Sequence, residues 1–177
     1  MIIQGDTLYS VLDSDIENGT IEIPKTITKI SKLSFQNLKK LYHITIPKNV
    51  EIVEDEVFQF CQNMEHINFE NVNCKLGDAV FRGCTNLRKI GLPQNLTNVK
   101  TECFFDCCRI TSLTLPKTVK KIDKHAFSYM PELTDIWIPN DVMAITQEQF
   151  FYSKKVRVHY KGHIYTYADL DTYKIFS

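Results

Sequence analysis

The chain has 177 residues, of which 44% are hydrophobic and 24% are charged, a composition typical of a soluble globular protein with a real core. Its 21 basic and 21 acidic residues give a formal net charge of zero, so no global field attracts nucleic acid or anionic lipid. No apolar run approaches the roughly 18 residues that a membrane span needs. We therefore predict no nucleic-acid partner and no membrane insertion.

The first segment, residues 1–18, predicts an N-terminal β cap. Its sequence, "MIIQGDTLYSVLDSDIEN", is typical of a β-hairpin or a pair of short strands that shields the edge of the neighbouring segment. It has neither the basic start nor the long apolar core of a secretory signal. Together with six cysteines whose positions favour unpaired thiols, this absence indicates a cytoplasmic location.

Residues 19–155 consist of six copies of a 23-residue repeat without any insertion. One register holds proline in every copy except the third, where Glu70 takes its place. Eleven residues after this register, every copy has a phenylalanine. The prolines are Pro24, Pro47, Pro93, Pro116 and Pro139, and the phenylalanines are Phe35, Phe58, Phe81, Phe104, Phe127 and Phe150.

Each copy predicts one coil of a solenoid. The alternating residues "LTLP", 113–116, indicate a short half-buried strand that the proline ends. A turn and the inward pair Val119 and Ile122 follow, and Phe127 with Met130 has the spacing of a single helical turn. A unit this small cannot bury its own apolar side, so neighbouring units must stack, about 4.8 Å apart along a parallel sheet. The predicted fold is a repeat solenoid with a parallel β-sheet on one face and turns and single helical turns on the other.

Two places depart from this pattern. In the third copy Glu70 replaces proline and Asn73 replaces an inward Val or Leu, which predicts a locally distorted turn with Val72 in the inward role. Residues 156–177 predict a C-terminal β cap. It begins with a seventh strand one residue short of register, continues through Gly162 into another strand, and ends in a helical turn from Ala168 to Ile175.

The unit from Leu41 to Cys61 resembles the BspA-type leucine-rich repeat, and the tail "VHYKGHIYTY" resembles the ending common in that family. The resemblance covers residues 19 to 153. It implies an α/β-type leucine-rich repeat solenoid, curved and right-handed, that binds rather than catalyses. It also implies adhesion or host interaction at a cell surface, or as a secreted protein, in contrast to the cytoplasmic location that the missing signal indicates.

The outward positions of the predicted sheet form the candidate binding site. We expect one column of Thr20, His43, His66, Lys89, Ser112 and Asp135, and a second of Glu22, Thr45, Asn68, Gly91, Thr114 and Trp137. An exposed tryptophan on such a face is a plausible binding anchor, although the C-terminal cap could equally cover Trp137. The predicted partner is a protein, with a glycan as the alternative. The partner-binding residues are His43, His66, Lys89, Asp135 and Trp137, extended by Arg157 and His159.

The cysteines and the catalytic motifs argue against chemistry at this face. Cys61, Cys84 and Cys107 share a register with Leu38 and Met130, so they predict a buried apolar column, and Cys103 also falls on a core position. There is no Cys-x-x-Cys pair, and no third ligand accompanies the two histidines, so we predict no metal and no cofactor. Phosphate loops and hydrolase motifs are missing, so the chain is predicted not to be an enzyme.

Two questions stay open at this level. Phe60, Tyr129 and Tyr152 share one register, and Phe105 and Phe151 share the one before it; this cluster is either an exposed interface or packing between neighbouring coils. The alternative function is a structural spacer of a larger surface protein that binds no ligand, which burial of Trp137 under the C-terminal cap would favour. The oligomeric state is not determined by the sequence.

Overall fold

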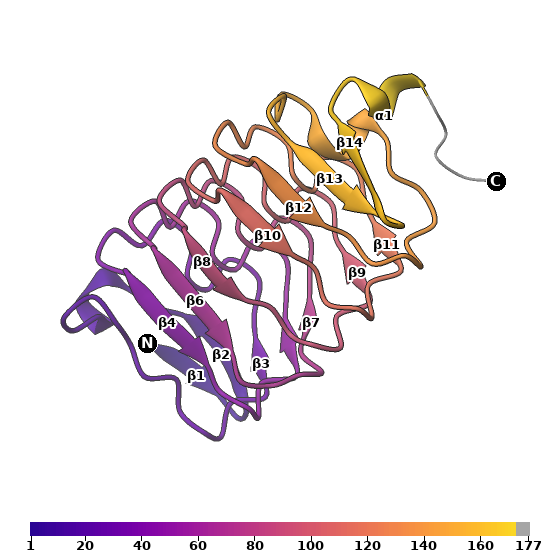
Figure 1. Cartoon of the computed structure of the whole chain (residues 1–177). Helices are drawn as coiled ribbons and strands as arrows, with labels where there is room; N and C mark the ends of the chain where they lie inside the picture. The colour runs from indigo at the N-terminus through magenta and orange to yellow at the C-terminus, as the bar shows by residue number, and fades with distance from the viewer. Residues whose placement is uncertain (173–177) are drawn as a thin grey trace.

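The computed structural model describes residues 1–172, with only the backbone of residues 171 and 172, and shows a solenoid in which equivalent residues of successive coils line up through the molecule (Figure 1). The predicted repeat solenoid is confirmed. The second to fifth copies each contribute a strand to a first sheet, a shorter strand to a second sheet, and a turn that closes the coil.

The first sheet lies on the face towards the viewer in Figure 1 and has two parts. The coils pair in parallel with an offset of 23 residues, as His43 does with His66. The last coil is offset by 22, since Asp135 pairs with Arg157, so the strand predicted to be one residue short of register is confirmed. The three-stranded part holds β4 (His43–Ile46), β6 (His66–Phe69) and β8 (Lys89–Gly91), and the four-stranded part holds β10 (Ser112–Thr114), β12 (Asp135–Trp137), β13 (Arg157–Tyr160) and the antiparallel β14 (His163–Thr166).

The second sheet consists mostly of two-residue strands and was not predicted. Residues such as Val53 were expected to point inwards after a turn, with no strand assigned to them; they do point inwards, and they lie in a strand. Two residues are too few to show an alternating pattern in a sequence. One part holds β1 (Ile2–Gln4), β2 (Thr7–Ser10), β3 (Lys29–Ile30), β5 (Ile52–Val53) and β7 (Lys75–Leu76), and the other holds β9 (Asn98–Val99) and β11 (Lys121–Ile122).

The N-terminal cap is the antiparallel hairpin β1–β2, which extends the second sheet because β2 pairs in parallel with β3. The first sheet receives no such extension. The segment 20–23, expected as the first strand, forms no strand, although Ile21 and Ile23 remain buried and Gly19 O accepts the N–H groups of Tyr42 and His43.

The turn side of the coils forms a continuous aromatic spine. All six repeat phenylalanines are fully buried, and the ring centroids of neighbours lie 5.0 to 6.0 Å apart. Backbone bonds accompany the rings; for example, Phe81 N–H donates to Cys103 O at 3.0 Å and Phe104 N–H to Ala126 O at 2.8 Å. The rings therefore stack in a column as the repeat predicted, and apolar burial and hydrogen bonding stabilise the same side of each coil.

The segments expected to be single helical turns are hydrogen-bonded turns in most coils. In these turns residues such as Glu56 and Phe60 adopt left-handed backbone angles, with φ of 57° and 60°. The sixth copy has a 3₁₀ helix, Gln147–Phe150, and another, Asp13–Asp15, lies in the N-terminal cap. Of the helical turn expected from Ala168 to Ile175, the structure shows α1 (Asp169–Thr172), and the remainder lies outside the described residues.

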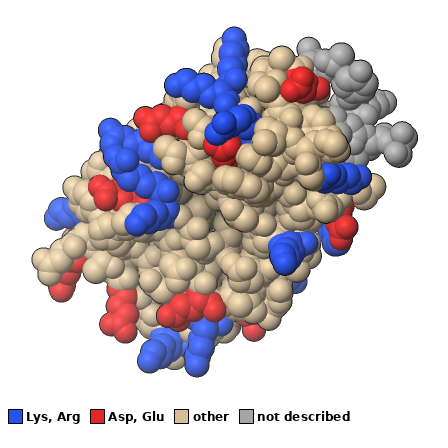
Figure 2. All heavy atoms as spheres, viewed as in Figure 1, with Lys and Arg blue, Asp and Glu red and all other residues tan. Residues whose placement is uncertain are grey.

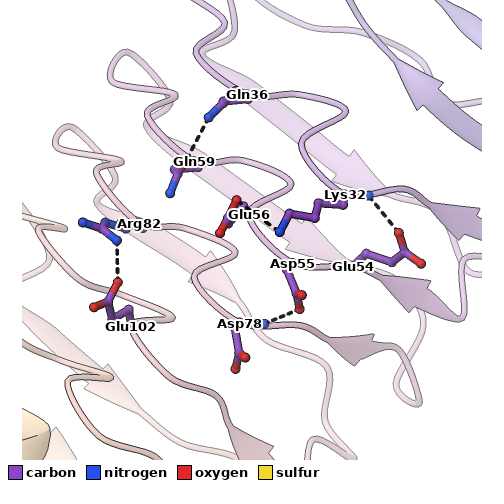
Figure 3. A network of polar contacts seen from close by, with 9 residues as sticks. All are labelled: Lys32, Gln36, Glu54, Asp55, Glu56, Gln59, Asp78, Arg82 and Glu102. Atoms are coloured by element: carbon purple, nitrogen blue, oxygen red, sulfur yellow. Dashed lines mark hydrogen bonds and ion pairs between the residues drawn. The ribbon is translucent and has the colours of Figure 1, made fainter.

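Polar side chains on the turn side repeat the stacking (Figure 3). The amides of Gln36 and Gln59 bond at 2.8 Å, and Arg82 forms an ion pair with Glu102 at 2.6 Å. Lys32 donates its backbone N–H to Glu54 at 2.9 Å. Each contact joins a coil to its successor, so these polar side chains follow the same coil-to-coil stacking as the buried phenylalanines.

The third copy has the distorted turn that was predicted, but Val72 does not point inwards. Val72 is 44% exposed, whereas Cys74 is 2% exposed and takes the inward role. The cause is a turn that closes one residue later than in the second copy. Cys74 N–H donates to Asn71 O, while the corresponding bond of the second copy runs from Val50 N–H to Pro47 O.

Candidate functional site

The N-terminal half of the first-sheet face carries three nitrogen-bearing side chains in one row. His43, His66 and Lys89 are direct partners on β4, β6 and β8, and the two imidazole rings lie 4.9 Å apart. Beside them the Asn68 side chain lies over Gly91, where an added Cβ would come within 2.1 Å of Asn68 Oδ1. Glycine at this position therefore makes room for the amide, and the row borders a shallow hollow.

The C-terminal half is organised around Asp135. Its carboxylate accepts hydrogen bonds from Arg157 Nη2 at 2.6 Å and pairs with His159 Nε2 at 2.8 Å. The hydrogen bond from Arg157, followed by that from His159, holds the pKa of Asp135 well below its ordinary value. Asp135 thus stays ionised and anchors two side chains of the C-terminal cap to the sheet.

Trp137 is exposed rather than covered by the cap. Its side chain retains 43% of its accessible surface, and its indole stacks on the His159 ring at a centroid distance of 4.5 Å and an angle of 16°. The cap therefore supports one face of Trp137 and leaves the remainder accessible. Because Asp135 orients His159 and His159 supports Trp137, the indole is held in place before any partner arrives.

The five predicted residues form two groups rather than one continuous row. The first sheet is interrupted between β8 and β10, so His43, His66 and Lys89 belong to one part and Asp135 and Trp137 to the other. Figure 2 shows charged side chains mainly along the margins of this view, around a broad uncharged area.

Arg157 and His159, expected as an extension of the site, contact Asp135 in the second group, and Asn68 with Gly91 lies beside the first group. Sequence reasoning placed Asn68 and Gly91 in an outward column without seeing their contact. The signal was a glycine among larger residues in a strand, which indicates close approach of another group. Among residues 1–172, no three histidine, cysteine or acidic side chains converge as metal ligands.

The cysteine column is buried, as predicted, and its thiols also donate hydrogen bonds. Cys61 Sγ lies 2.9 Å from Phe35 O, and the next two copies repeat this contact at 3.1 and 3.2 Å. Burial raises the pKa of Cys61 to about 12, so the thiol stays protonated and can keep donating. All six cysteines are free thiols, and only Cys108 among them is more than marginally exposed.

The second aromatic cluster is both exposed and packed between coils. The ring centroid of Tyr129 lies 4.9 Å from Phe105 and 4.8 Å from Tyr152, yet Tyr129 and Tyr152 keep 41% and 51% of their surface. This surface lies on the turn side, apart from the first-sheet face.

Comparison with known families decides the classification. The BspA type leucine rich repeat region matches residues 12–131 and 56–169, with six copies. The chain belongs to the BspA-type leucine-rich repeat family. Proteins of this repeat family and fold are generally non-enzymatic, and the family fits a protein-interaction module or a repeat of a surface protein.

Solved bacterial leucine-rich repeat proteins share the fold. A leucine-rich repeat protein of T. pallidum is similar over 82% of this chain and 70% of its own, with a TM-score of 0.75 and 18% identity. A leucine rich cell surface protein of Faecalibacterium prausnitzii reaches a TM-score of 0.67 at 19% identity, over 88% of this chain and 51% of its own. The pneumococcal vaccine antigen PcpA reaches 0.60 at 16% identity, over 80% of this chain and 45% of its own.

These solved structures establish the shared fold and nothing more, because identities of 16–19% do not carry over residue roles. The chain spans about half the length of the second and third of them. No curated protein matches the chain. No helix within residues 1–172 is long and apolar enough to cross a membrane.

Proposed function

We propose that this BspA-type repeat is a non-enzymatic binding module whose first-sheet face engages a protein partner. The observation that carries the proposal is Trp137, which is 43% exposed and stacked on His159. Aromatic side chains that are rigid before binding contribute strongly to interfaces, because little conformational entropy is lost when the partner arrives.

The remainder of the face supports the same function. At the far end His43, His66 and Lys89 offer hydrogen-bond donors, and the hollow beside them contains no carboxylate among its lining residues. A protein partner could place an apolar group on Trp137 and acceptor groups over the histidine row. A glycan with acidic groups is the alternative occupant of the row.

The setting we propose is adhesion or host interaction at a cell surface or as a secreted protein. The similar fold of a cell surface protein from F. prausnitzii supports this setting. The competing setting is the cytoplasm, which the unpaired thiols support.

The test compares captured proteins across three versions of the chain. Wild type, a sheet-face variant with Trp137→Ala and His66→Ala, and a control with Tyr129→Ala and Tyr152→Ala are immobilised and exposed to whole lysate and to host matrix extract. The control removes two half-exposed aromatic side chains from the turn side. We expect one set of proteins to be retained by wild type and control and lost from the sheet-face variant.

Purified partner then gives the affinity. Loss of the indole and one imidazole at a central contact should weaken binding by about 2 kcal/mol or more, roughly thirtyfold. Identical capture by all three versions would refute the sheet-face site and favour the spacer. Trp137 is the only tryptophan, so its fluorescence also reports directly whether the partner covers it.

A further inference from the structure

The second sheet contains a slot that the proposed function does not use. β7 pairs with β5, and β9 pairs with β11, but within residues 1–172 β7 and β9 do not pair with each other. The third and fourth coils remain hydrogen-bonded to each other on both sides of this gap. Asn95 N–H donates to Val72 O at 2.7 Å on one side, and Ala79 N–H donates to Thr101 O at 2.8 Å on the other. The opening is therefore bounded, not a general separation of the coils.

The slot lies beside the irregular turn of the third copy. Asn73 and Cys74 line it, and these are the residues at which the turn closes one position late. The cavity measures about 520 Å³, within the range of about 300–1,000 Å³ usual for ligand sites. Its apolar lining comes from Cys74, Leu76 and Leu96, which are 2%, 6% and 6% exposed.

Two hydrogen-bonding groups at the slot lack partners. Asn98 Oδ1 is buried without a partner, while the Nδ2 of the same amide donates to Asp123 at 3.3 Å. Glu54, Gly77 and Asp123, which occupy one register, each donate a backbone N–H to the preceding coil. Lys100 holds the same register, and its N–H makes no such bond to any of residues 1–172. Lys100 lines the slot, so its N–H is an unpaired donor at the opening, whereas the Asn98 oxygen is buried.

The charges at the slot favour an acidic ligand. Lys75 and Lys100 both line it, and neither forms an ion pair with any described side chain. The nearby Asp123 carboxylate is already paired with Lys121 at 2.6 Å. The excess charge at the opening is therefore positive.

We propose that this slot, formed by β7 and β9, binds an extended acidic peptide segment of a partner. A peptide C=O of the segment accepts the free Lys100 N–H. Because the coils close again on both sides of the gap, the segment crosses the slot rather than adding a strand along it, and one peptide unit enters between β7 and β9. Acidic side chains of the segment pair with Lys75 and Lys100.

The test selects ligands from a phage-displayed library of random ten-residue peptides on the immobilised full chain. Enriched peptides are synthesised, and their affinity is measured by fluorescence polarisation for three proteins: wild type, a variant with Lys75→Glu and Lys100→Glu, and a control with Lys155→Glu. Lys155 is exposed and lies on the turn side, away from the slot. We expect enriched sequences to be acidic and to lose at least tenfold in affinity for the double variant, with no change for the control.

Hydrogen exchange supplies a second measurement on the same complexes. The bound peptide should slow exchange of the Lys100 amide and leave the amides of the histidine row unchanged. No enrichment, or peptides that bind the double variant as well as wild type, would overturn the proposal. So would a dimer of the chain that dissociates in the double variant, since the occupant would then be a second copy. These outcomes are independent of the first-sheet face, because Trp137 and His66 are not part of the slot.

Discussion

The turn side and the strand sides of this solenoid share the same 23-residue repeat, but contacts between successive coils are continuous only on the turn side. On the turn side the phenylalanine spine crosses all six copies without a break, and its largest centroid separation is 6.0 Å. On the strand sides both sheets are interrupted next to the fourth coil, the first sheet after β8 and the second sheet before β9. Buried ring packing tolerates little displacement, whereas a two-residue strand adds few bonds and can open while its coil stays docked.

The largest effect is expected from a substitution that interrupts the buried phenylalanine column. Phe104 lies between Phe81 and Phe127, at centroid distances of 5.4 and 5.6 Å. Phe104→Ala should lower the free energy of unfolding by about 3–5 kcal/mol, measured by urea denaturation, because it leaves a cavity in the column. Phe105→Ala, on a partly exposed neighbour, should cost less. A loss below about 1 kcal/mol for Phe104→Ala would contradict the spine as the main source of stability.

The hydrogen bonds that support the spine give the next largest effect. Ser153 is fully buried, donates to Phe127 O at 2.6 Å and accepts from Met130 N–H at 2.9 Å. Ser153→Ala leaves both groups unsatisfied and should cost about 1–3 kcal/mol. Ser153→Cys is the matched control, because the equivalent residue is a cysteine in three other copies, and it should recover much of the loss. Equal destabilisation by both variants would show that the hydroxyl bonds contribute little.

Amide hydrogen exchange tests whether the second sheet is interrupted between β7 and β9. The amides of Gly77 and Asp123 donate to the preceding coil at 2.9 and 2.8 Å, and the amide of Lys100 in the coil between them does not. We expect the Lys100 amide to exchange about tenfold faster than these two under native conditions. Equal protection at the three positions would mean that the sheet is continuous in solution.

The smallest effect concerns the first-sheet face in acid. Because Arg157 and His159 depress the pKa of Asp135, the ionised carboxylate contributes stability that is present above its ordinary pKa of 3.8 and is lost as the pH falls through the lower folded value. Asp135→Asn should remove this contribution. Wild type should therefore exceed the variant in stability near neutral pH, and the difference should vanish in strong acid. Trp137 fluorescence and urea denaturation at each pH provide the measurement, and a constant difference would contradict it.

The repeat made most of this architecture predictable. A phenylalanine every 23 residues and the alternating apolar pairs were enough to expect stacked coils, a parallel sheet and a buried thiol column. The outward placement of His43, His66 and Trp137 followed from the same alternation. The second sheet could not be foreseen, because strands such as β5 contain two residues and lack a period. Val72 was misassigned because sequence spacing does not tell where a turn without proline closes.

The candidate surfaces depended more on three-dimensional contacts. The sequence showed that Glu70 and Asn73 break the repeat, but not that the break lies beside a slot with an unpaired Asn98 oxygen. Nor could it decide between an exposed and a covered Trp137, since that depends on how His159 docks on β12. These features arise from small differences in how neighbouring coils meet.

By itself, the amino-acid sequence determined that this chain winds into coils and which residues line up in each column. Periodic burial is a property of one coil, so it is written into each 23-residue copy. Only the tertiary structure decided where the sheets part, which aromatic side chains stay exposed and which polar groups are left without partners. Those outcomes depend on contacts between residues of different coils, and no single copy contains them.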